Sequence, residues 1–126
     1  MKHFLILANT DKDINLELSN MIHSYIMGCG ATSVIICDEN HYNGNYIKEE
    51  YLTDIEAVIV LGGDGTMLRA VHSLCGHDIP LLGVNLGTLG FLTEIEKSNV
   101  KKAIDRLIMD DYKLERRMMI EGNVND

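Results

Sequence analysis

The sequence predicts a three-layer α/β domain built on a mainly parallel sheet. Short apolar runs, rich in β-branched residues, alternate with longer stretches in which apolar residues recur at helical spacing. Runs of this kind are typical of parallel strands covered on both faces, and their alternation with helices favours crossover units. Glycine-rich segments follow two of the runs. Ligands of such folds bind at the carboxyl ends of the strands, so these segments are the first candidates for a site.

The first half of the chain predicts one strand–helix–strand unit. A nearly all-apolar strand covers residues 3–9, and Thr10 or Asp11 is a candidate cap for the helix that follows. A second, β-branched strand covers residues 32–37. The apolar residues on one face of the intervening helix are Ile14, Leu18, Met21, Ile22, Tyr25 and Ile26.

The middle of the chain holds a polar connection and a buried strand. Residues 38–46 are rich in glycine and asparagine, which favours a connecting loop, with a ligand lid as the alternative. Residues 47–55 predict a short helix, residues 57–61 a buried strand, and residues 79–84 a further strand after the next helix.

A final helix is predicted over residues 96–109, with Ser98 as a candidate cap. Its apolar stripe is expected to be core: Val100, Ala103, Ile104, Leu107 and Ile108.

Composition excludes several classes of function. The chain has 126 residues, 46% of them hydrophobic, and a formal charge of −8. No apolar run reaches the ~20 residues of a membrane span, and an acidic chain does not suit an extended nucleic-acid surface. Cys29, Cys37 and Cys75 have no metal-site or paired spacing, so we expect small buried or half-buried thiols in a reducing compartment. We therefore expect a cytoplasmic protein with no membrane or nucleic-acid partner.

Residues 61–69, Leu-Gly-Gly-Asp-Gly-Thr-Met-Leu-Arg, form the segment around which the domain is organised. Bare glycine backbone lets successive amides face an anion such as phosphate, and a helix N-terminus, with Thr66 as a candidate cap, adds positive charge. A carboxylate in such a loop repels phosphate unless it binds a metal ion or takes part in a proton transfer. Asp64 could accept a hydroxyl proton in phosphoryl transfer, help to place Mg²⁺, or simply bond the amides of a tight turn.

A second segment makes the pattern specific. Residues 83–94, Gly-Val-Asn-Leu-Gly-Thr-Leu-Gly-Phe-Leu-Thr-Glu, follow another short apolar run. The pair, in this order and spacing, resembles the NAD kinase family (ATP-NAD kinase). The resemblance implies a Rossmann-like fold of the NAD kinase, diacylglycerol kinase and phosphofructokinase type.

The resemblance also implies a function. ATP or another phosphate donor, with Mg²⁺ or another divalent cation, would phosphorylate the 2′-hydroxyl of the adenosine ribose of NAD to make NADP. Asp64 would be the catalytic base, and no residue is assigned as a resident metal ligand. The residues expected to contact the nucleotides are Gly62, Gly63, Asp64, Gly65, Thr66, Arg69, Asn85, Gly90 and Phe91.

Several of these residues have a structural alternative. The glycines can serve the turn itself, Arg69 can be a solvated surface side chain, and Phe91 can be core. By resemblance, residues 1–111 form the N-terminal α/β nucleotide-binding domain, and residues 112–126 begin a second, mainly β domain that is truncated here. The fragment alone would then be inactive, and the full-length protein would be a homodimer or tetramer.

Two other functions compete with this one. A lipid or sugar kinase can carry a Gly-Gly-Asp-Gly loop, although the residues after both motifs differ from those usual in lipid kinases. A non-catalytic nucleotide-binding module is the alternative from outside the enzymes.

Overall fold

The computed structural model describes residues 1–9, 13–37, 42–43, 46–47, 51–62, 64–74, 79–85 and 95–109. Within these ranges a five-stranded sheet has the order β2-β1-β5-β6-β7, and every pair of neighbouring strands is parallel. The strands are β1 (His3–Ala8), β2 (Thr32–Cys37), β5 (Ala57–Gly62), β6 (Leu81–Asn85) and β7 (Ile95–Glu96).

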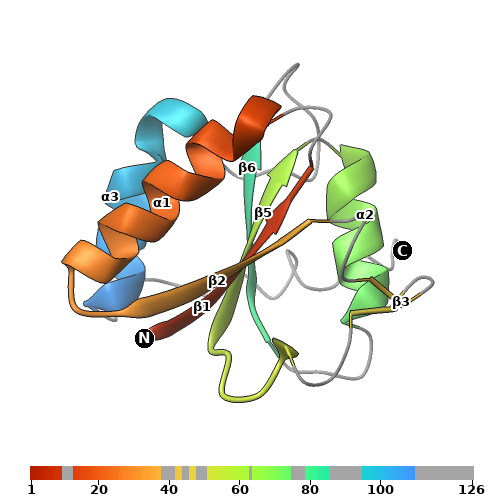
Figure 1. The fold of residues 1–126 in the computed structure, drawn as a ribbon, viewed down its shortest axis with the longest axis horizontal. Helices are drawn as coiled ribbons and strands as arrows, with labels where there is room; N and C mark the ends of the chain where they lie inside the picture. The colour runs from red at the N-terminus through yellow and green to blue at the C-terminus, as the bar shows by residue number, and fades with distance from the viewer. Residues whose placement is uncertain are drawn as a thin grey trace.

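Helices cover both faces of this sheet. Helices α1 (Glu17–Gly28) and α3 (Val100–Ile108) lie on one face, and α2 (Asp64–Ser73) lies on the other (Figure 1). The core is divided in the same way, because alternate strand residues point to opposite faces. Phe4 and Ile59 belong to one buried cluster, and their chain neighbours Leu5 and Val58 belong to the other. The predicted three-layer α/β fold with a parallel sheet is confirmed.

The middle of the sheet explains why these segments became strands. Every residue of β5 is buried, as is β1 from Phe4 onward, so both faces of each strand are covered. Full burial of one Ile or Leu side chain stabilises the folded state by roughly 1.5–3 kcal/mol. The two strands pair in register from Phe4↔Ala57 to Ala8↔Leu61. This buried pairing therefore fixes where β1 and β5 end relative to each other.

Helix α1 begins later than the sequence predicts. A short 3-10 turn, Ile14–Leu16, precedes it, and Asn15 and Leu16 have left-handed φ values of 57° and 56°. The Asp13 carboxylate, only 5% exposed, accepts hydrogen bonds from the amides of Leu18 and Ser19. Asp13 thus satisfies the first helical amides, and the predicted caps, Thr10 and Asp11, lie outside the described residues.

The segment before α3 also differs from its prediction. Strand β7 and a 3-10 turn, Lys97–Asn99, occupy the first residues of the predicted helix, and α3 starts only at Val100. The residue before the helix is Asn99, whose side chain makes no capping bond, and Ser98 lies within the 3-10 turn. The expectation that Ser98 is the cap is therefore wrong. The apolar stripe is confirmed where it is fully buried, at Val100, Ile104 and Leu107.

The polar connection contains two short strands rather than loop alone. Strand β3 (Tyr42–Asn43) pairs antiparallel with β4 (Tyr46–Ile47). Tyr and Ile favour strands, and the Gly-Asn dipeptide of the sequence between the two strands favours a hairpin. The predicted helix over residues 47–55 is wrong at Ile47, which belongs to β4; Tyr51 is in 3-10 conformation and residues 52–54 form a turn. None of the helices in the described ranges is long and apolar enough to cross a membrane.

Candidate functional site

The two glycine-rich motifs end neighbouring strands. Gly62 is the last residue of β5 and Asn85 is the last residue of β6, and their Cα atoms are register partners. The segments 61–69 and 83–94 therefore leave the sheet side by side at its carboxyl edge. Helix α2 starts at Asp64, so its N-terminal amides and their partial positive charge belong to the same edge.

The order in which the chain adds strands to the sheet reverses next to β1. From β1 the chain places β2 on one side and β5 on the other. The crevice outside the carboxyl ends of two such strands is the general ligand position in open α/β sheets. Asn9, the residue that follows β1, and the start of α2, the helix that follows β5, flank this switch point. The topology thus gives a reason for a site here that does not depend on the motifs.

Gly62 is required by close packing as well as by any ligand. A Cβ atom at this position would lie 2.5 Å from Oγ1 and 2.7 Å from Cβ of Thr66. Ordinary carbon contacts are near 3.5–4.0 Å, so a side chain does not fit unless Thr66 moves. The structural alternative for Gly62, that the turn needs it, is therefore supported. A second role toward a ligand is compatible with it.

Thr66 lies inside the first turn of α2 rather than before it. The helix begins two residues earlier, at Asp64, so the expectation that Thr66 is the cap is wrong. Its side chain is 5% exposed, and its hydroxyl oxygen accepts a hydrogen bond of 2.9 Å from the Asn9 side-chain amide. The bond joins the end of β1 to the start of α2, 57 residues later in the chain.

Asn9 was missed by the sequence reasoning, which placed it at the end of the first strand. The signal was available, because Asn9 is the first polar residue after the apolar run of β1. A polar side chain at the carboxyl end of a parallel strand faces the edge where ligands bind.

The N-terminus of α1 is already occupied by an anion of the protein itself. Besides its two backbone partners, the Asp13 carboxylate accepts a hydrogen bond of 2.5 Å from the Ser19 hydroxyl. A carboxylate that accepts three hydrogen bonds at a helix start complements the helix dipole. These amides of α1 are therefore satisfied internally.

The structure places six of the predicted site residues on the elements of this edge. Gly62 ends β5, Asn85 ends β6, and the other four belong to α2: Asp64, Gly65, Thr66 and Arg69. Gly63, Gly90 and Phe91 lie outside the described residues, so expectations for them stay predictions.

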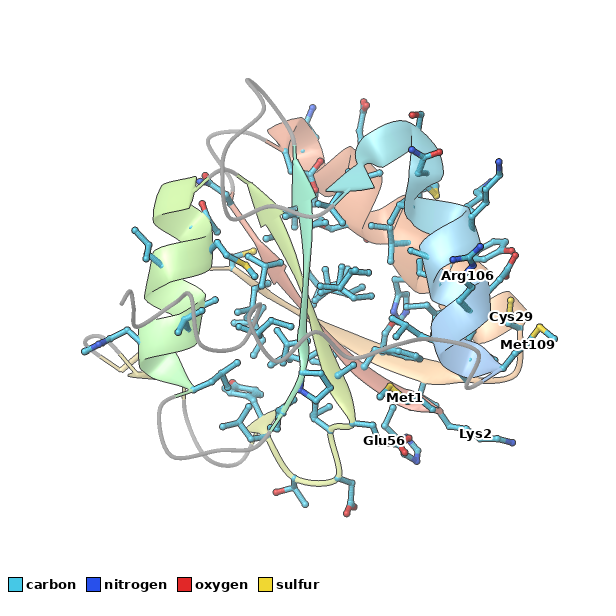
Figure 2. The ribbon with its side chains drawn as sticks, turned by 180° about the vertical axis from the view of Figure 1, so that it is seen from behind. Met1, Lys2, Cys29, Glu56, Arg106 and Met109 are labelled. Atoms are coloured by element: carbon cyan, nitrogen blue, oxygen red, sulfur yellow. The ribbon has the colours of Figure 1, made fainter. Side chains whose placement is uncertain are left out.

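The opposite edge of the sheet is held by local hydrogen bonds. The Glu56 carboxylate accepts bonds of 2.6 Å and 3.1 Å from the amides of Lys2 and His3, and Figure 2 shows Lys2 and Glu56 close together there. The Lys2 amide in particular holds the pKa of Glu56 below its usual value.

The histidines of this half of the molecule have structural partners. His3 and His23 form hydrogen bonds through Nδ1 with the hydroxyls of Thr32 and Ser33. Within the described ranges, no group of three or more His, Cys, Asp or Glu side chains could hold a metal ion.

The cysteines only partly follow their prediction. Cys37 is buried as expected, whereas Cys29 is exposed, which corrects the expectation for it. Cys29 follows α1 in the turn before β2, near Arg106 and Met109 at the end of α3 (Figure 2). Cys75 lies outside the described residues.

Helices α1 and α3 are joined by the Tyr25 hydroxyl, which donates a hydrogen bond of 2.5 Å to the Asp105 carboxylate. That bond, with some burial, raises the pKa of Tyr25 to about 12.

Known proteins place the chain in a family. The family model for the ATP-NAD kinase N-terminal domain matches residues 4–112. An NAD kinase of Lachnoclostridium phytofermentans is 46% identical over 125 residues, which are 98% of this chain and 44% of that protein. An NAD kinase of Agathobacter rectalis is 42% identical over 125 residues, with the same coverage. The chain thus spans less than half the length of these relatives.

A solved structure agrees at the level of the fold. The crystal structure of yeast NADH kinase complexed with NADH aligns with a TM-score of 0.55 and 17% sequence identity, over 87% of this chain and 39% of that one. The family match at residues 4–112 includes both glycine-rich segments and the strands that carry them. The chain therefore belongs to the ATP-NAD kinase N-terminal domain family.

Proposed function

We propose that the protein containing this chain is an NAD kinase. It transfers the γ-phosphoryl group of ATP to the 2′-hydroxyl of the adenosine ribose of NAD, and the products are NADP and ADP. One observation carries the proposal: in a member of this family, the two motif segments leave adjacent strands, with Gly62 and Asn85 as register partners. A ligand at that edge meets both motifs at once.

The proposed chemistry assigns one task to each part of the edge. The 2′-oxygen attacks the γ-phosphorus, the bond to the β,γ-bridging oxygen breaks, and the carboxylate of Asp64 accepts the hydroxyl proton. A positioned base contributes typically ~10²–10⁴-fold to such a step. The N-terminal amides of α2, with Gly63 and Gly65, are proposed to face phosphate oxygens, since a helix N-terminus attracts anions.

The remaining predicted residues are proposed to hold the dinucleotide. Asn85 would bond a polar edge of the ligand, Arg69 a phosphate, and Phe91, beside Gly90, a planar ring. The divalent cation, Mg²⁺ or another, is proposed to enter with the triphosphate of ATP as part of the substrate complex. Bound to the phosphates, the cation would neutralise the negative charge that develops during transfer.

Beyond residue 111 the proposal extends to a second domain. Residues 1–111 would be the nucleotide-binding half, and residues 112–126 would begin a mainly β domain that completes the site. Homo-oligomerisation of the complete gene product is proposed with it, and light scattering would test the mass. The cytoplasm is the proposed compartment, because cysteines without paired or metal-site spacing suit a reducing environment.

The test is the choice of acceptor by the complete gene product. We expect NADP to form from NAD and Mg-ATP, and no phosphorylated product to form from an NAD analogue with a 2′-deoxyadenosine ribose. Phosphorylation of a lipid or sugar in place of NAD would overturn the proposal in favour of another kinase. Binding of NAD without turnover would favour a nucleotide-binding module. The 126-residue chain alone is expected to form little or no NADP.

A further inference from the structure

The hydrogen bond between Asn9 and Thr66 links the residue after β1 to the helix after β5, and these two strands flank the switch point. Asn9 follows β1, and Thr66 belongs to the first turn of the helix that follows β5. The strands themselves are held in register up to Ala8↔Leu61, one residue short of Asn9 and Gly62. The side-chain bond therefore extends the β1–β5 connection beyond the last register pair.

Thr66 has little freedom to move from this position. Its oxygen accepts the bond of 2.9 Å from Asn9, and its side chain fills the space that a Cβ atom at Gly62 would need. It is also 5% exposed, so the hydrogen bond lies where water does not compete freely for the hydroxyl. Asn9 and Gly62 thus hold the Thr66 side chain from two directions.

The backbone held in this way carries the residue that the proposed reaction uses as its base. Asp64 and Thr66 belong to the same first turn of α2, two residues apart. A shift of that turn relative to β1 would move Asp64 and the helix amides together. Phosphoryl transfer depends mainly on positioning, and a displacement of ~1 Å at such a site can reduce the rate ~10²-fold.

We propose that Asn9 is a positioning residue for phosphoryl transfer, acting through Thr66 to fix the first turn of α2 against the end of β1. The inference rests on the proposed NAD kinase function. Asn9 needs no contact with either substrate in this role. Its removal should reduce kcat more than it changes the KM for NAD.

The test is a double-mutant cycle in the complete gene product, with NADP formation as the assay. The variants are Asn9→Leu, which keeps the side-chain shape without the donor, Thr66→Val, which removes the hydroxyl, and the pair together. We expect each single variant to lose roughly 10–100-fold in kcat, as for a misplaced catalytic group. The double variant should lose no more than the worse single variant, because both remove the same bond.

A matched control separates positioning from loss of stability. Thr32→Val makes the same chemical change at a threonine whose hydroxyl bonds His3 at the opposite edge of the sheet. Because its hydrogen bond is exposed and that of Thr66 is largely shielded from water, Thr32→Val should lower the thermal midpoint no more than Thr66→Val, and it should leave kcat within about twofold. Thr66→Ser, which retains the hydroxyl, should recover most of the activity lost in Thr66→Val. If Asn9→Leu does not fold, Asn9→Gln, which displaces the amide by one methylene group, takes its place.

The outcomes distinguish this inference from the function on which it rests. A wild-type protein that makes no NADP contradicts the proposed function. A wild-type protein that makes NADP, with folded Asn9 and Thr66 variants whose kcat stays within about twofold, contradicts the positioning role alone. Losses that simply multiply in the double variant would also overturn it.

Discussion

Replacing Gly62 by alanine tests how tightly the start of α2 is packed. The new Cβ atom would lie 2.5 Å from Oγ1, 2.7 Å from Cβ and 3.1 Å from Cγ2 of Thr66. Overpacking of this kind costs typically about 1–3 kcal/mol. As Thr66 turns to relieve part of this clash, its bond with Asn9 is also lost, and a neutral hydrogen bond contributes about 0.5–1.5 kcal/mol.

The two effects together predict a loss of about 2–4 kcal/mol in the free energy of unfolding of Gly62→Ala. For a chain of 126 residues this corresponds to a fall of roughly 8–16 °C in the thermal midpoint. Thermal and urea unfolding of the 126-residue chain, followed by circular dichroism, would measure both quantities.

Two other glycines provide matched controls for the same change. Gly28 ends α1 and a Cβ atom there meets nothing within 4 Å, so Gly28→Ala should be neutral or stabilising by up to about 1 kcal/mol. Gly30 is equally open but has a φ of 87°, so Gly30→Ala should cost about 1–2 kcal/mol through backbone strain alone.

Adding Thr66→Ala to Gly62→Ala should recover part of the loss at most. Two of the three close contacts disappear, while the Cβ of residue 66 remains at 2.7 Å. A Gly62→Ala chain with a midpoint within about 2 °C of the wild type, or equal losses at Gly28 and Gly62, would refute the close packing of Gly62 against Thr66.

Three further predictions concern the rest of the fold. Ile59→Ala in the fully buried β5 should lower the free energy of unfolding, measured with urea, by about 2–5 kcal/mol. Val34→Ala should lower it much less, because that side chain is 47% exposed, and similar losses in the two variants would contradict the assigned burial. Because the folded pKa of Glu56 is depressed, its stabilising contribution is present above the ordinary value of 4.5 and is lost as pH falls through the folded pKa. The stability advantage of wild type over Glu56→Gln should therefore shrink on acidification, and an advantage that grows would refute this. The pKa of Tyr25 is raised from 10.0 to about 12, so the stability that its bond with Asp105 contributes is fully present below pH 10.0 and is lost as the pH rises through 12. In ultraviolet titration, Tyr25→Phe should differ from the wild type by one tyrosinate, and only near pH 12.

The parts of the fold that the sequence predicted are those governed by burial. Strand β2 has the predicted bounds, residues 32–37. The predicted stripe of α3 is buried at Val100, Ile104 and Leu107, because apolar periodicity reflects which face of a helix is covered. Cap positions were predicted less well. Ser98 was a plausible cap by residue type, but strand β7 and a 3-10 turn take up the first residues of the predicted helix.

The position of the candidate site in the fold follows from the motifs, whereas the pairing of its elements does not. Both glycine-rich segments were predicted at the carboxyl ends of parallel strands, and the structure adds that Gly62 and Asn85 are register partners. Asn9 could have been noticed as the first polar residue after β1, but its bond with Thr66, 57 residues away, could be recognised only once β1 was known to lie next to β5. The exposure of Cys29 was missed because it depends on how the turn after α1 meets solvent.

Asp64, at the start of α2, is proposed as the base for phosphoryl transfer to NAD, and Asp64→Asn in the complete gene product tests that role. The substitution removes a carboxylate base and keeps the side-chain size, so NADP formation from NAD and Mg-ATP should fall by ~10²–10⁴-fold with an unchanged thermal midpoint. A folded Asp64→Asn enzyme with kcat within about twofold of the wild type would contradict the account.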